Sequence, residues 1–318
     1  MNRYDSLTEW NALFHNALES FVEKLKQDEQ VIAAVLFGSL SYDQVWEKSD
    51  LDLKLIVHDQ KLARRMMCFV EQGIWINATI DTRNDFKRWM ERSVQSSIGH
   101  SMLVRGKLLF TKDRTIEEYF EQIRHIGERD RQLQLLQLGC HVISMLSKAE
   151  KWFYVKRDPA YSAFWLIKMV DVLAKVEVVL NREVPMREAV HQAMAFHPEF
   201  FEVIYKGLIA GHTDENKVRQ ALDLVAAYIG DRAEELFRPI LDYLRHEQDI
   251  RTITDIEEKL GAVAGMDAGG LGVACSWLAD RGTIVHAPAP AKATPKSRVA
   301  LEEPAFFIEP EDDYQFGA

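Results

Sequence analysis

The segment VIAAVLFGSLSYDQVWEKSDLDLKLIVHD, residues 31–59, contains two strand-like runs joined by a polar loop. The first run is apolar and stops at Gly38-Ser39, and the second begins at Asp50. Side chains alternate faces along a strand, so we expect Asp50 and Asp52 on one face and the leucines on the other. Two carboxylates beside a glycine turn suit a divalent cation, Mg²⁺ or Mn²⁺, bound together with phosphates.

The Gly-Ser turn has a phosphate-binding interpretation and a simpler one. Gly38 allows close backbone approach, and Ser39 offers a hydroxyl and an N–H to a phosphate. Gly-Ser is also a common surface turn, and Asp50 and Asp52 would then be solvated acids at a strand start. The order of strand, Gly-Ser, spacer and Asp-x-Asp favours the phosphate and metal site.

This order of residues resembles the nucleotidyltransferase superfamily, which includes polymerase-beta-like enzymes and antibiotic nucleotidyltransferases. The resemblance implies that Asp50 and Asp52 are catalytic and hold metal. It implies that Gly38 and Ser39 bind a nucleoside triphosphate. An acceptor hydroxyl would attack the α-phosphorus, and pyrophosphate would leave.

The superfamily usually has a third carboxylate on a neighbouring strand, and this sequence departs from that pattern. The candidate strand, residues 74–80, carries Asn77 at the expected position. Asp81 has the same strand parity and is a second candidate ligand if the strand ends or bends before it, but a turn or a cap of the following helix is the favoured explanation. A neutral amide binds a divalent cation less strongly than a carboxylate, so catalysis is in doubt while nucleotide binding is not.

Other candidate residues lie outside the motif. Lys54 shares the face of the two acids and fits either a phosphate contact or an ion pair. Lys168 and Asp171 share a helix face with Tyr161 and Lys175. Lys168 is a candidate for binding the triphosphate and Asp171 for a general base, with a water-facing polar stripe as the alternative.

The neighbouring aromatic side chains are expected in the core and not in a base-stacking platform. They are Trp152, Phe153, Phe164 and Trp165.

The expected fold class is α+β, a small mixed nucleotidyltransferase sheet with flanking helices, followed by a helical bundle and a winged-helix-like domain. Residues 1–114 form the first domain, 115–250 a helical substrate-binding domain, 251–301 the winged-helix region and 302–318 an acidic tail. The element order is similar to that of bacterial nucleotidyltransferase-like proteins with a C-terminal helix-turn-helix domain.

Periodicity assigns the elements of the first domain. We expect helices at 7–25, 61–72 and 85–92, and strands at 31–37, 51–57, 74–80 and 106–111.

The C-terminal region is expected to contain two short helices and a two-stranded wing at 283–286 and 298–301. Lys292, Lys296 and Arg298 in the wing could meet phosphates, at the level of a few contacts. The second helix, LGVACSWLAD, has no side chain suited to reading base edges, so sequence-specific DNA binding is not expected. Packing or homodimer contact is the favoured role.

Composition limits the class of protein. The chain is 318 residues long with a net charge of −10, which disfavours general nucleic-acid binding but permits a local basic patch. Its three scattered cysteines predict a reduced, cytoplasmic protein. No apolar run reaches membrane-spanning length and no signal-peptide core is present, so no membrane partner is expected.

The sequence therefore predicts an enzyme that binds a nucleoside triphosphate with metal and acts on an unidentified small or macromolecular acceptor. The alternative is a weakly active or inactive nucleotide sensor that acts through its winged-helix region.

Overall fold

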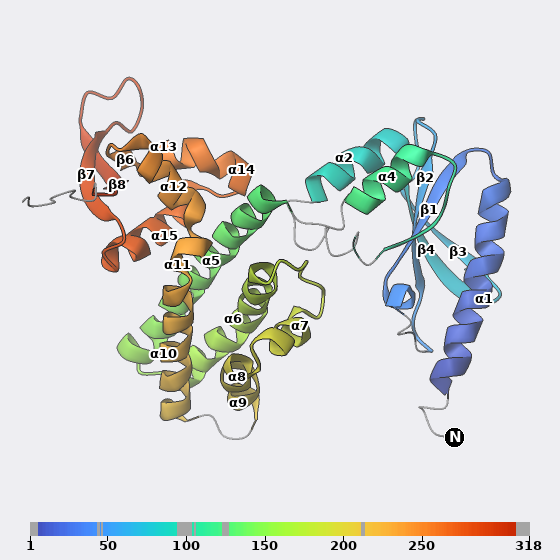
Figure 1. Cartoon of the computed structure of the whole chain (residues 1–318), viewed down its shortest axis with the longest axis horizontal. Helices are drawn as coiled ribbons and strands as arrows, with labels where there is room; N and C mark the ends of the chain where they lie inside the picture. Colours follow the sequence, from blue (N-terminus) through green and yellow to red (C-terminus); the bar gives the residue numbers. More distant parts are fainter. Residues whose placement is uncertain are drawn as a thin grey trace, which may run out of the picture. The chain divides into compact units, whose positions relative to one another are not determined.

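The computed structural model describes residues 6–42, 45, 47–93, 104, 106–122, 127–210 and 214–309. The chain divides into two compact units, residues 1–126 and 127–318 (Figure 1). The first unit is a mixed sheet with helices and the second is mainly helical, so the predicted α+β class is confirmed.

The first unit is built around a five-stranded sheet in the order β3-β4-β2-β1-β5. Strands β2 and β4 are parallel, and the other neighbouring pairs are antiparallel. Its elements are α1 (Ser6–Gln27), β1 (Val31–Phe37), η1 (Ser39–Tyr42), β2 (Leu51–Val57), β3 (Met66–Glu71), β4 (Ile74–Thr82), α2 (Arg83–Ser93), β5 (Lys107–Thr111) and α4 (Arg114–Gln122).

The two faces of this sheet are covered by different helices (Figure 1). Helix α1 packs Phe14 and Leu18 against Leu51 and Leu53 on one face. Helices α2 and α4 pack against the other face, which carries Val35. Strand alternation places Asp52 on this second face, as predicted.

The predicted helix over 61–72 is wrong, because residues 66–71 form strand β3 and residues 61–65 before it are not helical. Strands β3 and β4 form a hairpin in which Glu71 pairs with Ile74. Gln72 and Gly73 between them have φ values of 49° and 80°, and two central residues with positive φ are typical of a two-residue hairpin turn. In the sequence, the short apolar run that ends at Gln72-Gly73 was the signal for a strand followed by a hairpin turn.

The predicted domain boundary after residue 114 also differs from the structure. Helix α4 was expected to open the bundle, but Ile116 and Phe120 are buried against the sheet. The first compact unit therefore extends to residue 126.

The second unit contains a long helical hairpin, α5 and α6, with shorter helices around it (Figure 1). Its helical elements begin with α5 (Glu128–Glu150), η2 (Lys151–Val155), α6 (Pro159–Leu180), α7 (Ala189–Phe196), α8 (Pro198–Phe201), η3 (Glu202–Lys206) and α9 (Gly207–Ile209). They continue with α10 (Glu215–Asp231), α11 (Ala233–Leu236) and α12 (Arg238–Glu247).

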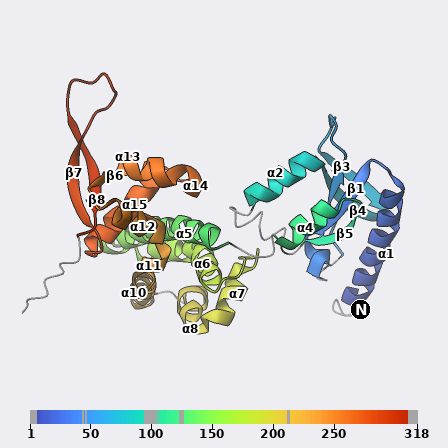
Figure 2. The ribbon, with the colours of Figure 1, turned by 45° about the horizontal axis from the view of Figure 1, so that its top comes forward.

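The C-terminal part adds β6 (Arg251–Thr252), α13 (Ile253–Ile256), η4 (Glu257–Gly261), α14 (Ala262–Ala264), α15 (Ala268–Asp280), β7 (Val285–Ala291) and β8 (Leu301–Phe307). The strands form a sheet in the order β6-β8-β7. Figure 2 shows the β7–β8 hairpin with its loop standing clear of the helices. The elements follow the predicted order, while the identification of a winged helix stays a prediction.

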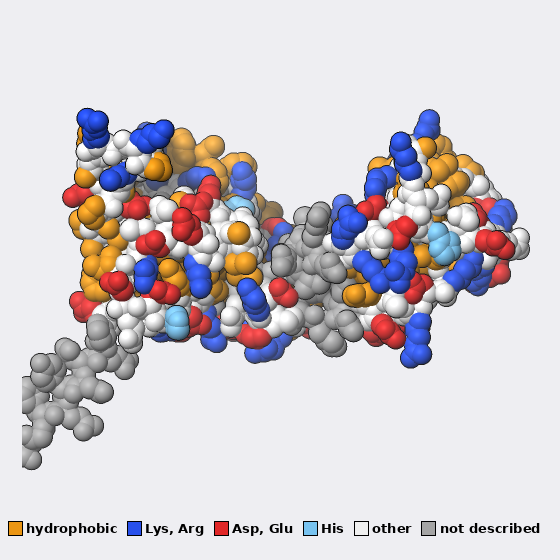
Figure 3. Space-filling view, turned by 90° about the horizontal axis from the view of Figure 1, so that it is seen from above, with side chains coloured by type: hydrophobic (Ala, Val, Ile, Leu, Met, Phe, Trp, Pro, Cys, Tyr) orange, Lys and Arg blue, Asp and Glu red, His pale blue; other side chains and the backbone are white. Residues whose placement is uncertain are grey.

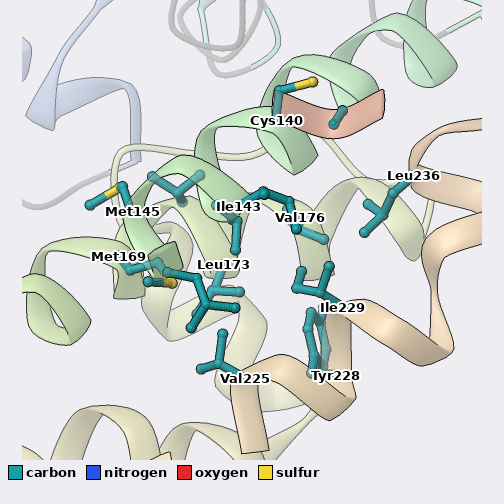
Figure 4. Packing of buried hydrophobic residues seen from close by; sticks show 14 of the residues in the cluster. Cys140, Ile143, Met145, Met169, Leu173, Val176, Val225, Tyr228, Ile229 and Leu236 are labelled. Atoms are coloured by element: carbon teal, nitrogen blue, oxygen red, sulfur yellow. The ribbon is translucent and has the colours of Figure 1, made fainter. Parts of the chain in front are cut away.

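One continuous core holds the second unit together. Figure 4 shows Ile143 of α5, Leu173 of α6 and Val225 of α10 directed towards one another. The same buried cluster includes Leu271 of α15 and Phe306 of β8. The region 251–301, predicted as a separate domain, therefore shares the core of the bundle.

The C-terminal strands are longer than predicted, and the acidic tail begins later. Residues 302–307, assigned to the tail, belong to β8, in which Ala305 and Phe306 are buried. Strand β7 contains Pro288 and Pro290 and lies at the sheet edge, where a missing N–H is tolerated. Residues 310–318 of the predicted tail lie outside the described residues.

No single helix in the described parts of the chain is both long and apolar enough to cross a membrane. One pair of helical segments reaches that length and composition when the two are taken together. The segments are Ile253–Ala264 and Ala268–Asp280, and the chain bends by 114° between them.

Candidate functional site

The turn after β1 places a glycine directly beside the second acid of the Asp-x-Asp motif. Gly38 has φ +74°, and a Cβ added there would lie 2.7 Å from Oδ2 of Asp52. The register pairs Phe37 with Asp52, which brings the end of β1 against the beginning of β2. Gly38 is therefore required both by the backbone conformation and by the closeness of the carboxylate.

The short helical turn η1 follows at once and begins with Ser39. The N–H and hydroxyl of Ser41 both donate to the Gly38 carbonyl, over 3.1 and 2.7 Å, and fix the turn. No hydrogen bond joins the half-buried Ser39 hydroxyl to another described residue. Ser39 thus keeps a donor and acceptor that a phosphate could use.

The acids meet Asn77 across the parallel pair β2–β4. Asp52 is opposite Asn77 in the register, and the Asn77 amide donates to Oδ2 of Asp50 over 2.5 Å. Asp50 is exposed and Asp52 is half-buried. The three residues named from the sequence, Asp50, Asp52 and Asn77, therefore lie together.

This donor set fits a divalent cation that binds through oxygen. Two carboxylates and an amide oxygen are ligands of the kind that Mg²⁺ takes, with phosphates and water completing its shell. Within the described residues, no three or more His, Cys, Asp or Glu side chains gather closely enough to hold a metal by themselves.

Asn77 is arranged as a hydrogen-bond donor to the acids. Its Nδ2 faces Asp50, and its Oδ1 lies 3.4 Å from Sγ of Cys68 on β3. To ligate a cation beside Asp50, the amide would have to rotate and exchange this hydrogen bond for a metal contact. Cys68 was not singled out from the sequence, because its closeness depends on the β3–β4 pairing.

Lys54 and Asp81 bind each other. Lys54 Nζ lies 2.7 Å from Oδ2 of Asp81 and 4.4 Å from the centre of the Trp89 ring, and both charged residues are buried. Arg65 also contacts Asp81, over 3.4 Å. Of the two interpretations left open for Lys54, the structure shows the ion pair.

Asp81 also lies further along β4 than Asn77. In the register it is opposite Ile56, whereas Asn77 is opposite Asp52. As a candidate third ligand it would have to leave both Lys54 and Arg65.

Lys168 and Asp171 are exposed on α6. Asp171 pairs with Lys175 over 2.6 Å, and the Lys168 ammonium lies over the rings of Phe164 and Trp165. Their nucleotide and base roles stay predictions. The expectation that Phe164 is a core residue is wrong, because its side chain is 48% exposed.

A groove of about 690 Å³ opens elsewhere on the second unit, between α8, η3 and α10. It is lined by His197, Tyr228 and Arg232 among others, and Lys168 and Asp171 do not line it. Beneath it, the buried Glu177 carboxylate accepts a hydrogen bond from the Tyr228 hydroxyl over 2.6 Å.

Comparisons with known proteins agree with this geometry. Residues 19–115 match the family model for the polymerase beta nucleotidyltransferase domain. A comparison with curated protein sequences gave no match.

Two solved structures are similar to this chain to different degrees. The crystal structure of a nucleotidyltransferase-like protein from Exiguobacterium sibiricum 255-15 has 13% sequence identity and a TM-score of 0.63, covering 93% of this chain and 99% of that one. At this identity the similarity shows a shared fold over both units. Spectinomycin adenyltransferase AAD(9) from Enterococcus faecialis has 10% identity and a TM-score of 0.28, covering 71% of this chain and 100% of that one.

The matched residues contain the sheet, the Gly-Ser turn, both aspartates and Asn77. Residues 19–115 are therefore identified as a nucleotidyltransferase domain of the polymerase beta family.

Proposed function

We propose that this protein binds a nucleoside triphosphate with Mg²⁺ or Mn²⁺ at Asp50 and Asp52 and transfers its nucleotidyl group to an acceptor hydroxyl. The observation that carries the proposal is the convergence of Gly38 at the end of β1, Asp50 and Asp52 at the beginning of β2, and Asn77 within β4. A divalent cation bound there would neutralise charge on the phosphates.

The protein's own side chains position the carboxylates and the phosphates for this reaction. Asn77 holds the Asp50 carboxylate by its N–H, and the lack of a side chain at Gly38 leaves space for Asp52. In this proposal the Ser39 hydroxyl bonds a phosphate oxygen. In the transfer, the acceptor oxygen bonds to the α-phosphorus, the bond from that phosphorus to the bridging oxygen breaks, and pyrophosphate leaves. The hydroxyl proton passes to a base, for which Asp171 stays the candidate from the sequence.

Metal-dependent nucleotide binding tests the site directly. Titration calorimetry with ATP and with GTP, each with and without Mg²⁺, should show binding that needs the metal. The double change Asp50→Asn and Asp52→Asn should weaken it by about tenfold or more, equivalent to about 1.4 kcal/mol. Glu47→Gln removes an exposed charge from the preceding loop and is the matched control. Equal affinities in the double variant and the wild type would refute the assignment.

A second candidate is a nucleotide sensor with little or no turnover. Asn77 favours it, because the position opposite Asp52 lacks a third negative charge. Pyrophosphate release measured with small hydroxyl compounds, RNA and protein acceptors separates the two functions. Tight Mg-ATP binding without release in any mixture would support the sensor. The cytoplasmic location, homodimer and role of the predicted wing stay predictions.

A further inference from the structure

A row of aromatic side chains lies on the surface where α5 ends and α6 begins. We call it the aromatic–basic surface. It consists of Lys148, Trp152, Tyr161, Phe164, Trp165 and Lys168. Tyr161 and Phe164 are 40% and 48% exposed, although they belong to a helix with a large buried face.

The rings form a connected series. The centroids of Trp152 and Tyr161 are 4.3 Å apart, those of Tyr161 and Phe164 5.5 Å, and those of Phe164 and Trp165 6.5 Å. Tyr161, Phe164 and Lys168 follow one another at helical spacing, so they share one face of α6. The apolar core uses the opposite face, which carries Leu166 and Met169.

Lysines lie directly over these rings. Lys168 Nζ is 4.7 Å from the centre of the Trp165 ring and 5.4 Å from that of Phe164. Lys148 belongs to the neighbouring helix α5, and its Nζ is 4.9 Å from the centre of the same Trp165 ring. Each ammonium is thus held beside an aromatic face.

The adjoining turn adds more positive charge. Lys151, Lys156 and Arg157 are exposed in and after η2. Two acids of the same segment have contacts of their own: Asp158 caps α6 by accepting from the N–H of Tyr161 over 2.9 Å, and Asp171 pairs with Lys175 over 2.6 Å. Figure 3 shows Lys and Arg side chains interspersed with Asp and Glu side chains on the face that it draws.

Glu150 precedes Lys151 in the same segment, and burial raises the pKa of its carboxyl group above the usual range.

We propose that the aromatic–basic surface binds a single-stranded segment of nucleic acid. Bases would stack on the exposed rings of Tyr161 and Phe164, and the flanking lysines would contact phosphates. Exposed rings beside cations suit a ligand that combines planar faces with negative charge. A two-fold contact with a second copy would instead place the same cations near one another, which is unfavourable. This function is independent of the nucleotide site proposed at Asp50 and Asp52.

Fluorescence anisotropy of the full chain with labelled fifteen-residue oligo(dT) and oligo(U) tests the proposal. We expect both to bind, more weakly as salt rises, and any difference between them to report contact with the 2′-hydroxyl. Removing both rings in Tyr161→Ala/Phe164→Ala should weaken binding at least about fivefold, the lower limit for losing one stacked base. Lys148→Ala/Lys168→Ala should reduce the slope of log affinity against log salt by about 1.4.

Three further variants make the test specific. Tyr161→Leu/Phe164→Leu keeps apolar side chains and should lose binding as the alanine variant does. Phe196→Ala removes another exposed ring, 38% exposed on α7, and should bind as the wild type does. Asp50→Asn/Asp52→Asn should also bind normally, so failure here is separable from failure of the proposed nucleotide site.

Several results would overturn the proposal. Binding that persists in both ring variants, or that is lost only in Lys292→Ala/Lys296→Ala/Arg298→Ala, would place nucleic acid elsewhere. A dimer seen by light scattering that Tyr161→Ala/Phe164→Ala abolishes, with no oligonucleotide binding, would assign the surface to self-association. Circular dichroism and thermal unfolding establish that each variant is folded.

Discussion

The side-chain amide of Asn77 lies 2.5 Å from Oδ2 of Asp50, linking β4 to the residue that precedes β2. The N–H donor stabilises the carboxylate without a bound cation. A carboxylate at position 77 would instead face Asp50 with like charge, and would depend on a cation to hold the pair together.

Asn77→Asp should make folding more dependent on metal. Without divalent ions the variant should unfold at a lower temperature than the wild type, because two carboxylates replace a hydrogen bond. Adding Mg²⁺ should raise its unfolding temperature by more than it raises that of the wild type. Thermal unfolding in EDTA and in Mg²⁺ gives both values.

The control for this experiment is Asn84→Asp, which adds the same charge at an exposed position in the first turn of α2. It should show the Mg²⁺ response of the wild type. An Asn77→Asp protein that responds no more than Asn84→Asp, with a metal seen against Asp81, would mean that the third ligand is misplaced.

Gly38→Ala should destabilise the protein beyond the cost of its backbone conformation. The added Cβ would lie 2.7 Å from Oδ2 of Asp52, at φ +74°. Gly73 has φ +80° with nothing within 4 Å of an added Cβ, so Gly73→Ala isolates the conformational cost. That cost is about 1–2 kcal/mol. Urea unfolding should show a larger loss for Gly38→Ala.

A double-mutant cycle identifies the source of the excess. Combining Gly38→Ala with Asp52→Ala should recover part of the loss, because the truncated side chain no longer meets the new Cβ. Equal losses in Gly38→Ala and Gly73→Ala would show that the closeness to Asp52 is not a constraint.

Cys68 should be the one cysteine that alkylates readily in the folded protein. It is exposed, whereas Cys140 and Cys275 are buried. Burial raises the pKa of the Cys140 and Cys275 thiols to about 12, which leaves almost no thiolate at neutral pH. Mass spectrometry after N-ethylmaleimide treatment should find a single adduct before denaturation.

Mg-ATP should slow this reaction if the proposed site is correct, because Cys68 Sγ lies 3.4 Å from Asn77 Oδ1. Cys68→Ser provides the control, since it should take up no adduct in the native state. A labelling rate that Mg-ATP leaves unchanged, despite measured binding, would place the nucleotide away from Asn77.

Asp113 should contribute stability that disappears in acid. Its carboxylate accepts from Arg83 and from the N–H and hydroxyl of Thr115, and these bonds lower its pKa to about 2. A lowered folded-state pKa means that stabilisation is complete above the unfolded pKa of about 4 and is lost as pH falls towards 2.

Asp113→Asn should therefore be less stable than the wild type at pH 7, by at most about 2–3 kcal/mol. The difference should shrink between about pH 4 and pH 2 as the wild-type carboxylate is protonated. Urea unfolding from pH 7 to pH 3 measures it, with the exposed Asp223→Asn as control. A difference that stays constant down to pH 3 would contradict the ionic origin of the contribution.

Local pattern was sufficient for the elements that form the centre of the site. The apolar run 31–37, the Gly38-Ser39 turn and the alternation after Asp50 predicted β1, the turn and β2. It was insufficient at 61–72, where no alternation distinguishes strand from helix and the turn at Gln72-Gly73 carried the information. It also misjudged Phe164, because a helix of apolar residues does not show which apolar side chains remain outside the core.

By itself, the sequence determined the superfamily, the mixed sheet followed by a helical region, and the acids and turn that define the candidate site. Only the tertiary structure decided that Asn77 faces Asp50, that Lys54 is buried with Asp81, and that α4 belongs to the sheet. The physical reason is that strand alternation and helix periodicity are properties of neighbouring residues. Contacts between β2 and β4 depend on the strand order and register of the whole sheet, which no local stretch of the chain specifies.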